Sequence, residues 1–113
     1  MYSLFLDDIR SPEHIYAAEV AKDFIIVRSY SAFVQYIKTH GLPNLISFDN
    51  DLGLDENNIL ATDGYAAAKW LVYESGLDLI DLKFNVHSAN PVAAAQIRGL
   101  LTNYICFLKE ENP

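Results

Sequence analysis

Four short apolar segments alternate with four longer segments of helical pattern, and this alternation constrains the fold of the chain more than any other feature. Strands that are almost continuously apolar and alternate with helices indicate a parallel sheet covered on both faces. The length of 113 residues suits one domain, spanning 1–113, rather than two. The expected strands are Ser3–Leu6, Phe24–Arg28, Leu45–Phe48 and Leu82–Val86, and the expected helices cover 11–22, 31–40, 62–76 and 91–108.

Crossovers between parallel strands are almost always right-handed, which predicts the strand order 2-1-3-4 of a flavodoxin-like sheet that lacks its fifth strand. We therefore expect an α/β fold in three αβα layers, with the helices at 31–40 and 62–76 on one face and the helix at 11–22 on the other. The last helix is expected beside the helix at 11–22, because that face would otherwise stay half bare. Its apolar stripe consists of Ala93, Ile97, Leu100, Leu101, Tyr104 and Leu108.

The net charge of −7 gives the chain no general attraction for a phosphate backbone, so duplex nucleic acid is not an expected partner. The first residues lack the basic segment of a signal peptide, and no apolar run approaches the ~20 residues of a membrane span. A single cysteine, Cys106, cannot form a disulfide framework, which favours the cytoplasm, and its helical surroundings suggest a small core residue. The strand at 82–86 leaves an exposed edge, so we expect a monomer or a weak homodimer.

Acidic side chains follow two of the expected strands. Asp7 and Asp8 follow the first strand, and Asp49 and Asp51, in the segment LISFDNDLG, follow the third. The strand order places these two ends side by side, at the switch point where sheets of this kind bind ligands. Carboxylates this close repel one another, and either a raised pKa or a divalent cation relieves the repulsion. We expect all four acids to hold Mg²⁺ or Mn²⁺, and the alternative is that each acid only caps a helix or turn.

The fourth expected strand brings a histidine to the same edge. His87 follows that strand and is a candidate general acid or base near neutral pH. Ser88 and Asn90 come next, just before a helix N-terminus, where anions bind well. Arg10 and Arg28 follow the first two strands, where each could contact phosphate oxygens or form a surface ion pair. We interpret these two arginines, with Ser88 and Asn90, as candidate phosphate-binding residues.

The segments LDDIRSP, VRSY, ISFDNDLG, DGYAAAKWL and HSANP, in this order, resemble the cyclic-phosphate-processing receiver-like domain. The resemblance implies the receiver fold of two-component signalling. It also implies action on cyclic phosphate ends of RNA or on cyclic nucleotides, in RNA repair and conflict systems of bacteria and phages. At Asn50 the sequence departs from the family, where histidine is frequent, so His87 would work alone. Roles are implied for Asp7, Asp8, Arg10, Asp49, Asp51, His87, Ser88 and Asn90.

A degenerate receiver domain is the main alternative. In that interpretation Asp49 is the phospho-acceptor, and Ser88 is the hydroxyl that follows the fourth strand. A receiver also needs a lysine at the end of a fifth strand, whereas Lys69 and Lys83 fall in a helix and at the start of a strand. A domain that binds a cyclic nucleotide without turning it over is a third alternative.

Together these features predict a metal-dependent phosphoesterase that opens a cyclic phosphate on a small nucleotide or an RNA end. Asp7 or Asp8 would hold the metal with Asp49, and the cation would polarise the phosphoryl group. His87 would exchange a proton with the leaving oxygen or with water. Asp51 would be a further metal ligand or would orient one. The catalytic residues of this hypothesis are His87, Asp49 and Asp8.

Overall fold

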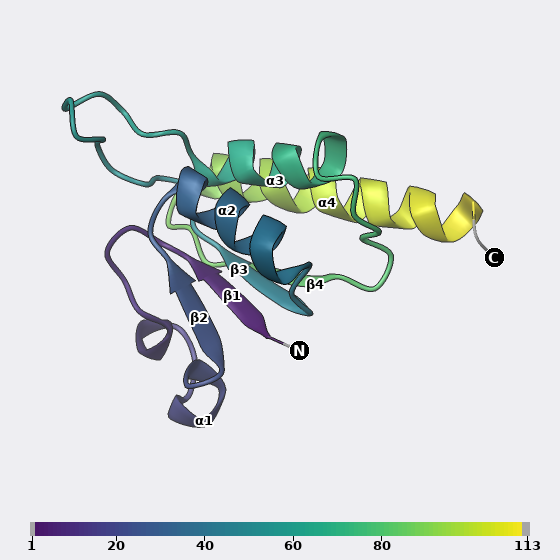
Figure 1. The fold of residues 1–113 in the computed structure, drawn as a ribbon, viewed down its shortest axis with the longest axis horizontal. Coiled ribbons are helices and arrows are strands. Elements are labelled where there is room, and N and C mark those ends of the chain that lie inside the picture. Colours follow the sequence, from purple (N-terminus) through teal and green to yellow (C-terminus); the bar gives the residue numbers. More distant parts are fainter. Residues whose placement is uncertain (1, 112–113) are drawn as a thin grey trace.

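A computed structural model describes residues 2–111, which form a four-stranded parallel sheet with helices (Figure 1). The strands are β1 (Ser3–Leu6), β2 (Phe24–Val27), β3 (Leu45–Phe48) and β4 (Lys83–Val86), and their order is β2-β1-β3-β4, as predicted. In register, the last residues of the four strands lie level with one another. The first residue after each strand therefore lies at one common edge of the sheet, and this alignment creates the candidate site.

Three helices cover one face of the sheet: α2 (Tyr30–His40), α3 (Gly64–Tyr73) and α4 (Pro91–Glu111). The first turn of α2 is capped by Ser29, whose Oγ accepts a hydrogen bond from the Ala32 backbone N–H at 3.1 Å, and α2 ends before Gly41, whose φ is 86°. The core between sheet and helices is apolar and contiguous. Its fully buried members include Leu4, Leu6, Phe33, Ile37, Ile46, Phe48, Leu71, Leu79, Ile97 and Leu101.

The expected position of the last helix was wrong. Figure 1 shows α4 alongside α3, on the same face as α2, and not beside the helical segment that follows β1. The cause is the alternation of polar and apolar residues in β4. Val86 and the half-buried Phe84 pack into the core beneath α4, whereas Lys83 and Asn85 are exposed and point to the other face. The apolar stripe of α4 therefore packs on the apolar side of β4, and the polar side of β4 stays exposed.

The opposite face of the sheet carries much less helix than predicted. In place of one helix over 11–22, the chain forms a 3₁₀ turn, η1 (Pro12–His14), and a single helical turn, α1 (Ala18–Ala21). Between them Tyr16 packs its ring on Phe24 of β2, with a centroid distance of 4.9 Å, and donates a hydrogen bond to Ser47 Oγ at 2.8 Å. This inward turn of Tyr16 interrupts the helix, so the third layer consists of short segments.

Cys106 is exposed on α4, so its prediction as a core residue was also wrong. Its neighbour Ile105 occupies the core-facing position of that turn. Within residues 2–111, no helix combines the length and the apolar character needed to cross a bilayer.

The start of α3 packs so closely on the end of β3 that it requires glycine at position 64. A Cβ at Gly64 would lie 1.8 Å from the Asp49 carbonyl oxygen, whereas a Cβ at Gly99 in α4 would meet nothing within 4 Å. We expect Gly64→Ala to lower the free energy of unfolding by about 3 kcal/mol, because the backbone must move. Gly99→Ala should raise it by up to about 1 kcal/mol through helix propensity. Urea unfolding of the two variants measures both effects, and an unchanged stability of Gly64→Ala would contradict the packing.

Candidate functional site

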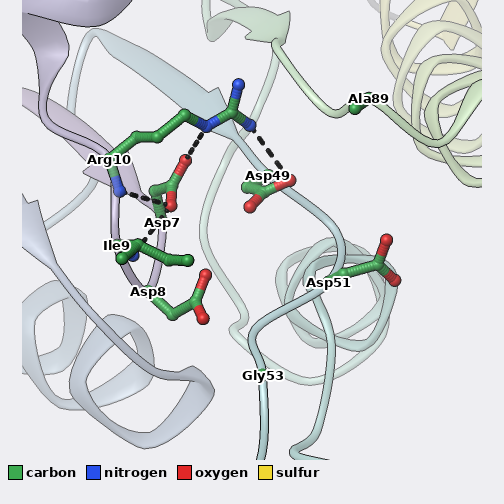
Figure 2. Close-up of a pocket in the computed structure, with 8 residues that line it drawn as sticks. All are labelled: Asp7, Asp8, Ile9, Arg10, Asp49, Asp51, Gly53 and Ala89. Carbon is green, nitrogen blue, oxygen red and sulfur yellow. Dashed lines mark hydrogen bonds and ion pairs between the residues drawn. The ribbon is translucent and has the colours of Figure 1, made fainter.

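A pocket of about 380 Å³ lies at the level where β1 and β3 end (Figure 2). Four aspartates and one arginine line it, together with the exposed side chain of Ile9. The sequence-predicted acids are therefore brought together as expected. The lining residues are Asp7, Asp8, Ile9, Arg10, Asp49, Asp51, Gly53 and Ala89.

Asp7 is fully buried, and both of its carboxylate oxygens accept hydrogen bonds. Oδ1 accepts from the backbone N–H groups of Ile9 at 3.0 Å and Arg10 at 2.9 Å, and Oδ2 accepts from Arg10 Nε at 2.9 Å and from His87 Nε2 at 3.1 Å. Burial alone would raise the pKa of Asp7, but these four donors and the Arg10 charge outweigh it and lower the pKa. Asp7 is therefore an ionised anchor that organises the loop after β1.

Arg10 joins the acids of β1 to those of β3. Its Nη2 lies 3.6 Å from Asp49 Oδ1 and donates to the His87 carbonyl oxygen at 3.2 Å, while Nε is bound to Asp7. Among the described residues Nη1 makes no hydrogen bond, and Figure 2 shows this nitrogen directed away from both carboxylates. Arg10 therefore neutralises part of the acidic cluster and retains one free donor group.

Asp49 is the least favourably placed acid of the pocket. Its side chain is buried at 7% exposure, and Asn50 is the only residue whose backbone N–H donates to it among those described, at 2.8 Å. Burial and the neighbouring charge of Asp7 raise the pKa of Asp49 to about 6, and the Asp8 charge adds to the effect. The Asn50 bond and the Arg10 charge offset only part of this increase.

Asp8 differs from Asp7 although the two are adjacent in sequence. Its half-buried carboxylate faces the pocket and accepts no hydrogen bond from the described residues (Figure 2). Gly53, with a φ of 76°, makes room for it, since a Cβ there would lie 2.7 Å from Asp8 Oδ2. A side chain at position 53 would therefore push the Asp8 carboxylate out of place.

Asn50 is a structural residue in this chain. It is buried, its Oδ1 accepts the Tyr65 backbone N–H at 3.0 Å, and its carbonyl accepts the Gly64 N–H at 2.9 Å, so it holds the start of α3. Its Nδ2 donates to Asp51 Oδ1 at 3.1 Å. Asp51 is exposed at the rim of the pocket, and Figure 2 shows its carboxylate turned away from Asp8 and Asp49.

His87 lies behind the pocket rather than in its wall. The side chain is 1% exposed, Nε2 contacts Asp7, and Nδ1 lies 2.7 Å from Ser47 Oγ. The ring stacks on Phe5 with a centroid distance of 4.5 Å and an interplanar angle of 6°. Burial lowers the pKa of His87, and the Arg10 charge lowers it further, although the bond and the charge of Asp7 oppose this shift. His87 is therefore a neutral, buried ring near pH 7.

Three predicted phosphate-binding residues do not reach the pocket. Arg28 Nη1 donates to the carbonyl oxygens of Asp7 and Arg10, so Arg28 braces the loop after β1 from outside. Ser88 Oγ accepts the Asn90 backbone N–H at 3.1 Å, and Asn90 Oδ1 accepts the Ala93 N–H at 3.1 Å. Ser88 and Asn90 thus cap the start of α4, and of the predicted phosphate ligands only Arg10 lines the pocket.

Ligand atoms of Asp7, Asp49 and His87 lie within 4.8 Å of one another, a spacing that a metal ion could bridge. Asp7 and His87 are already hydrogen-bonded to each other, and Arg10 occupies the space between Asp7 and Asp49. A cation at that point would have to displace the arginine. Asp8 and Asp49 are the carboxylates whose surroundings suit a cation better.

Sequence reasoning missed the residues on the opposite face of the sheet that support His87. Ser47 was treated as part of an apolar strand, and Tyr16 as part of a continuous helix. The alternation of Ile46, Ser47 and Phe48 was the available signal, because a serine between two core residues points to the other face. Nothing local to Tyr16 indicates that its hydroxyl reaches β3.

The family model of the cyclic-phosphate processing receiver domain matches residues 2–103. The chain belongs to this family. The receiver domain described here is also similar to a solved structure described as a yeast Spc42 trimeric coiled-coil segment fused to another structure. The TM-score is 0.58 at 16% identity, and the match covers 97% of this chain and 82% of that one, so the likeness concerns the fold alone. None of the curated proteins matches the chain.

The raised pKa of Asp49 predicts a pH-dependent cost of keeping this carboxylate ionised. The native state binds the Asp49 proton more tightly than the unfolded state, so this contribution to stability falls as pH rises from about 4 to about 6. We expect Asp49→Asn to raise the free energy of unfolding at pH 8 by on the order of 1–3 kcal/mol. The gain should shrink towards pH 5, where wild-type Asp49 is largely protonated.

Urea unfolding of wild type and variant at both pH values measures this difference. The exposed Asp23, in the turn before β2, gives the control variant Asp23→Asn, which should change stability little at either pH. A lower stability of Asp49→Asn at pH 8 would contradict the assignment.

Proposed function

We propose that this receiver domain is a metal-dependent phosphoesterase that opens cyclic phosphates on RNA ends or small nucleotides. The observation that carries the proposal is the pocket of a cyclic-phosphate processing family member whose lining includes four carboxylates and a single arginine. Such a pocket repels a phosphate unless a cation is present. The arrangement therefore favours a site that binds a divalent cation and a phosphate together.

The donor set fits a hard divalent cation. Asp8 accepts no hydrogen bond from the described part of the chain, and Asp49 is buried with a pKa raised to about 6, so a bound cation would relieve the repulsion at both carboxylates. Carboxylate oxygens with waters are the usual ligands of Mg²⁺. We assign Asp8 and Asp49 as the ligands and leave Asp7 out, because its oxygens already accept four hydrogen bonds. When bound, the cation would polarise a phosphoryl oxygen and neutralise its charge.

In this proposal Arg10 would contact the phosphate, and Ile9 would contact the ribose or the base. Arg10 Nη1 is free to donate to a phosphate oxygen, while Nε and Nη2 keep the guanidinium fixed on Asp7 and Asp49. Ile9, 79% exposed at the pocket, offers an apolar surface to a ribose or a base. Asp51 lies exposed at the rim with its carboxylate turned away from Asp8 and Asp49, so we assign it neither a metal contact nor a proton transfer (Figure 2).

The receiver alternative has one favourable observation, since Asp49 follows β3 and lies beside Asp8, where a phospho-acceptor would be. However, no strand follows β4 among residues 2–111, and no lysine lines the pocket. Lys69 lies over the Tyr65 ring, and Lys83 begins β4 at the far edge of the sheet. Phosphoryl transfer to Asp49 would therefore lack a lysine counter-charge.

Hydrolysis of 2′,3′-cyclic nucleotides and of RNA ending in a cyclic phosphate tests the proposal. We expect turnover that requires Mg²⁺ or Mn²⁺ and that falls at least about 100-fold in Asp8→Asn and in Asp49→Asn. The control Asp23→Asn should keep full activity. Absence of turnover by the wild type, or full activity of Asp8→Asn, would refute the phosphoesterase, and tight binding with recovery of intact nucleotide would favour a binding domain instead.

Incubation with a small phospho-donor such as acetyl phosphate separates the receiver alternative from the phosphoesterase. We expect no stable gain of one phosphate in the mass of the wild type, because the pocket holds no lysine. A mass increase that disappears in Asp49→Asn would instead support a phospho-accepting receiver.

A further inference from the structure

Four hydrogen bonds connect the exposed edge of the sheet to the anchor of the pocket. Asn85 Nδ2 donates to the Tyr16 hydroxyl at 2.9 Å, and that hydroxyl donates to Ser47 Oγ at 2.8 Å. Ser47 Oγ lies 2.7 Å from His87 Nδ1, and His87 Nε2 lies 3.1 Å from Asp7 Oδ2. This series of hydrogen bonds starts at Asn85 in β4, passes through Tyr16 between η1 and α1 to Ser47 in β3, and ends at His87 and Asp7, which follow β4 and β1.

The acceptor at one end of this hydrogen-bond series, Asp7, and the donor at the other, Asn85, determine which atom donates in each bond. Asp7 accepts the backbone N–H groups of Ile9 and Arg10 at Oδ1 and the Arg10 Nε–H at Oδ2, so its carboxylate acts as an acceptor and His87 Nε2 must carry a proton. His87 Nδ1 is then unprotonated and accepts from the Ser47 hydroxyl. Because Ser47 Oγ uses its proton on the ring, it can accept the Tyr16 hydroxyl proton, and Tyr16 in turn accepts from the Asn85 amide.

Packing prevents the His87 ring from rotating into another orientation. The ring is stacked on Phe5 and the side chain is 1% exposed, so rotation would leave buried ring nitrogens without partners. Ser47 is fully buried beside it. Among residues 2–111, Nδ1 is therefore held by the Ser47 hydroxyl, which in turn accepts from the Tyr16 hydroxyl.

We propose that Tyr16 and Ser47 are positioning residues that hold His87 as the Nε2–H tautomer, and that His87 in turn fixes Asp7 and Arg10 beneath the pocket. His87 then acts on the pocket through Asp7 and does not meet a ligand itself. This inference goes beyond the proposed function, because it describes how the pocket is held whether or not the domain turns over a cyclic phosphate. A failed hydrolysis assay leaves it intact, and its own test needs no substrate.

The test is a long-range ¹H–¹⁵N correlation spectrum of the His87 ring at about pH 8. We expect a protonated Nε2 and an unprotonated Nδ1 that is shifted by the hydrogen bond from Ser47. Ser47→Ala should move the Nδ1 resonance towards that of a free unprotonated nitrogen. Tyr16→Phe should move it a smaller distance in the same direction, because Ser47 still donates but is no longer polarised by Tyr16.

Tyr73→Phe is the matched control, since Tyr73 is 72% exposed on α3. It removes a hydroxyl from the same residue type and should leave the His87 resonances unchanged. A merely structural role of Tyr16 would change stability without moving Nδ1. A protonated Nδ1 in the wild type, or an Nδ1 resonance that stays in place in both Tyr16→Phe and Ser47→Ala, would overturn the proposal.

Chemical modification provides a second measurement with controls inside the chain. His14 and His40 are exposed, whereas His87 is buried behind Asp7. Diethyl pyrocarbonate should therefore modify His14 and His40 at least about ten times faster than His87, as read by mass spectrometry of peptides. Equal rates for the three histidines would place the His87 ring at the surface and overturn its assignment as a positioning residue.

Discussion

The carboxylate of Asp7 is the group on which the rest of the site depends. It accepts hydrogen bonds from Ile9, Arg10 and His87, so it fixes the loop after β1, the guanidinium and the residue after β4 at the same time. A buried carboxylate with fewer donors would cost several kcal/mol or would take up a proton. With four donors it stays ionised, and it ties together the residues that follow β1 and β4.

The hydrogen-bond donors that bind Asp7 are not available to the neighbouring carboxylates. Arg10 Nε binds Asp7, and Nη2 reaches Asp49 only at 3.6 Å, so the pKa of Asp49 stays raised. Asp8 accepts no hydrogen bond from any residue between 2 and 111. The pocket thus separates a structural carboxylate from carboxylates that can accept a ligand. Two consecutive aspartates have different roles because Asp7 is bound by the donors of Ile9, Arg10 and His87, whereas Asp8 points towards Gly53.

The strands, their order and the helices α2 and α3 could be predicted, because each is encoded in local patterns and the right-handed crossover rule leaves one arrangement. The position of α4 was mispredicted because the face of the sheet that carries residues 11–22 was expected to need a second helix. In the structure Lys83 and Asn85 alternate with Phe84 and Val86, so only one face of β4 calls for a helix. The length of the helix expected over 11–22 was also overestimated. Tyr16 turns inward because it binds Ser47, which lies far away in sequence.

The sequence by itself determined that acids, an arginine and a histidine would gather at one edge of a parallel sheet, because parallel strands end together and these residues follow their ends. Only the tertiary structure decided what each residue does there. Hydrogen-bond donors stabilise the buried Asp7 carboxylate, whereas burial raises the pKa of Asp49. Ser88 and Asn90 cap the start of α4, and His87 stacks on Phe5 behind the pocket. Hydrogen-bond donors and burial depend on neighbours from other elements, and no local pattern records them.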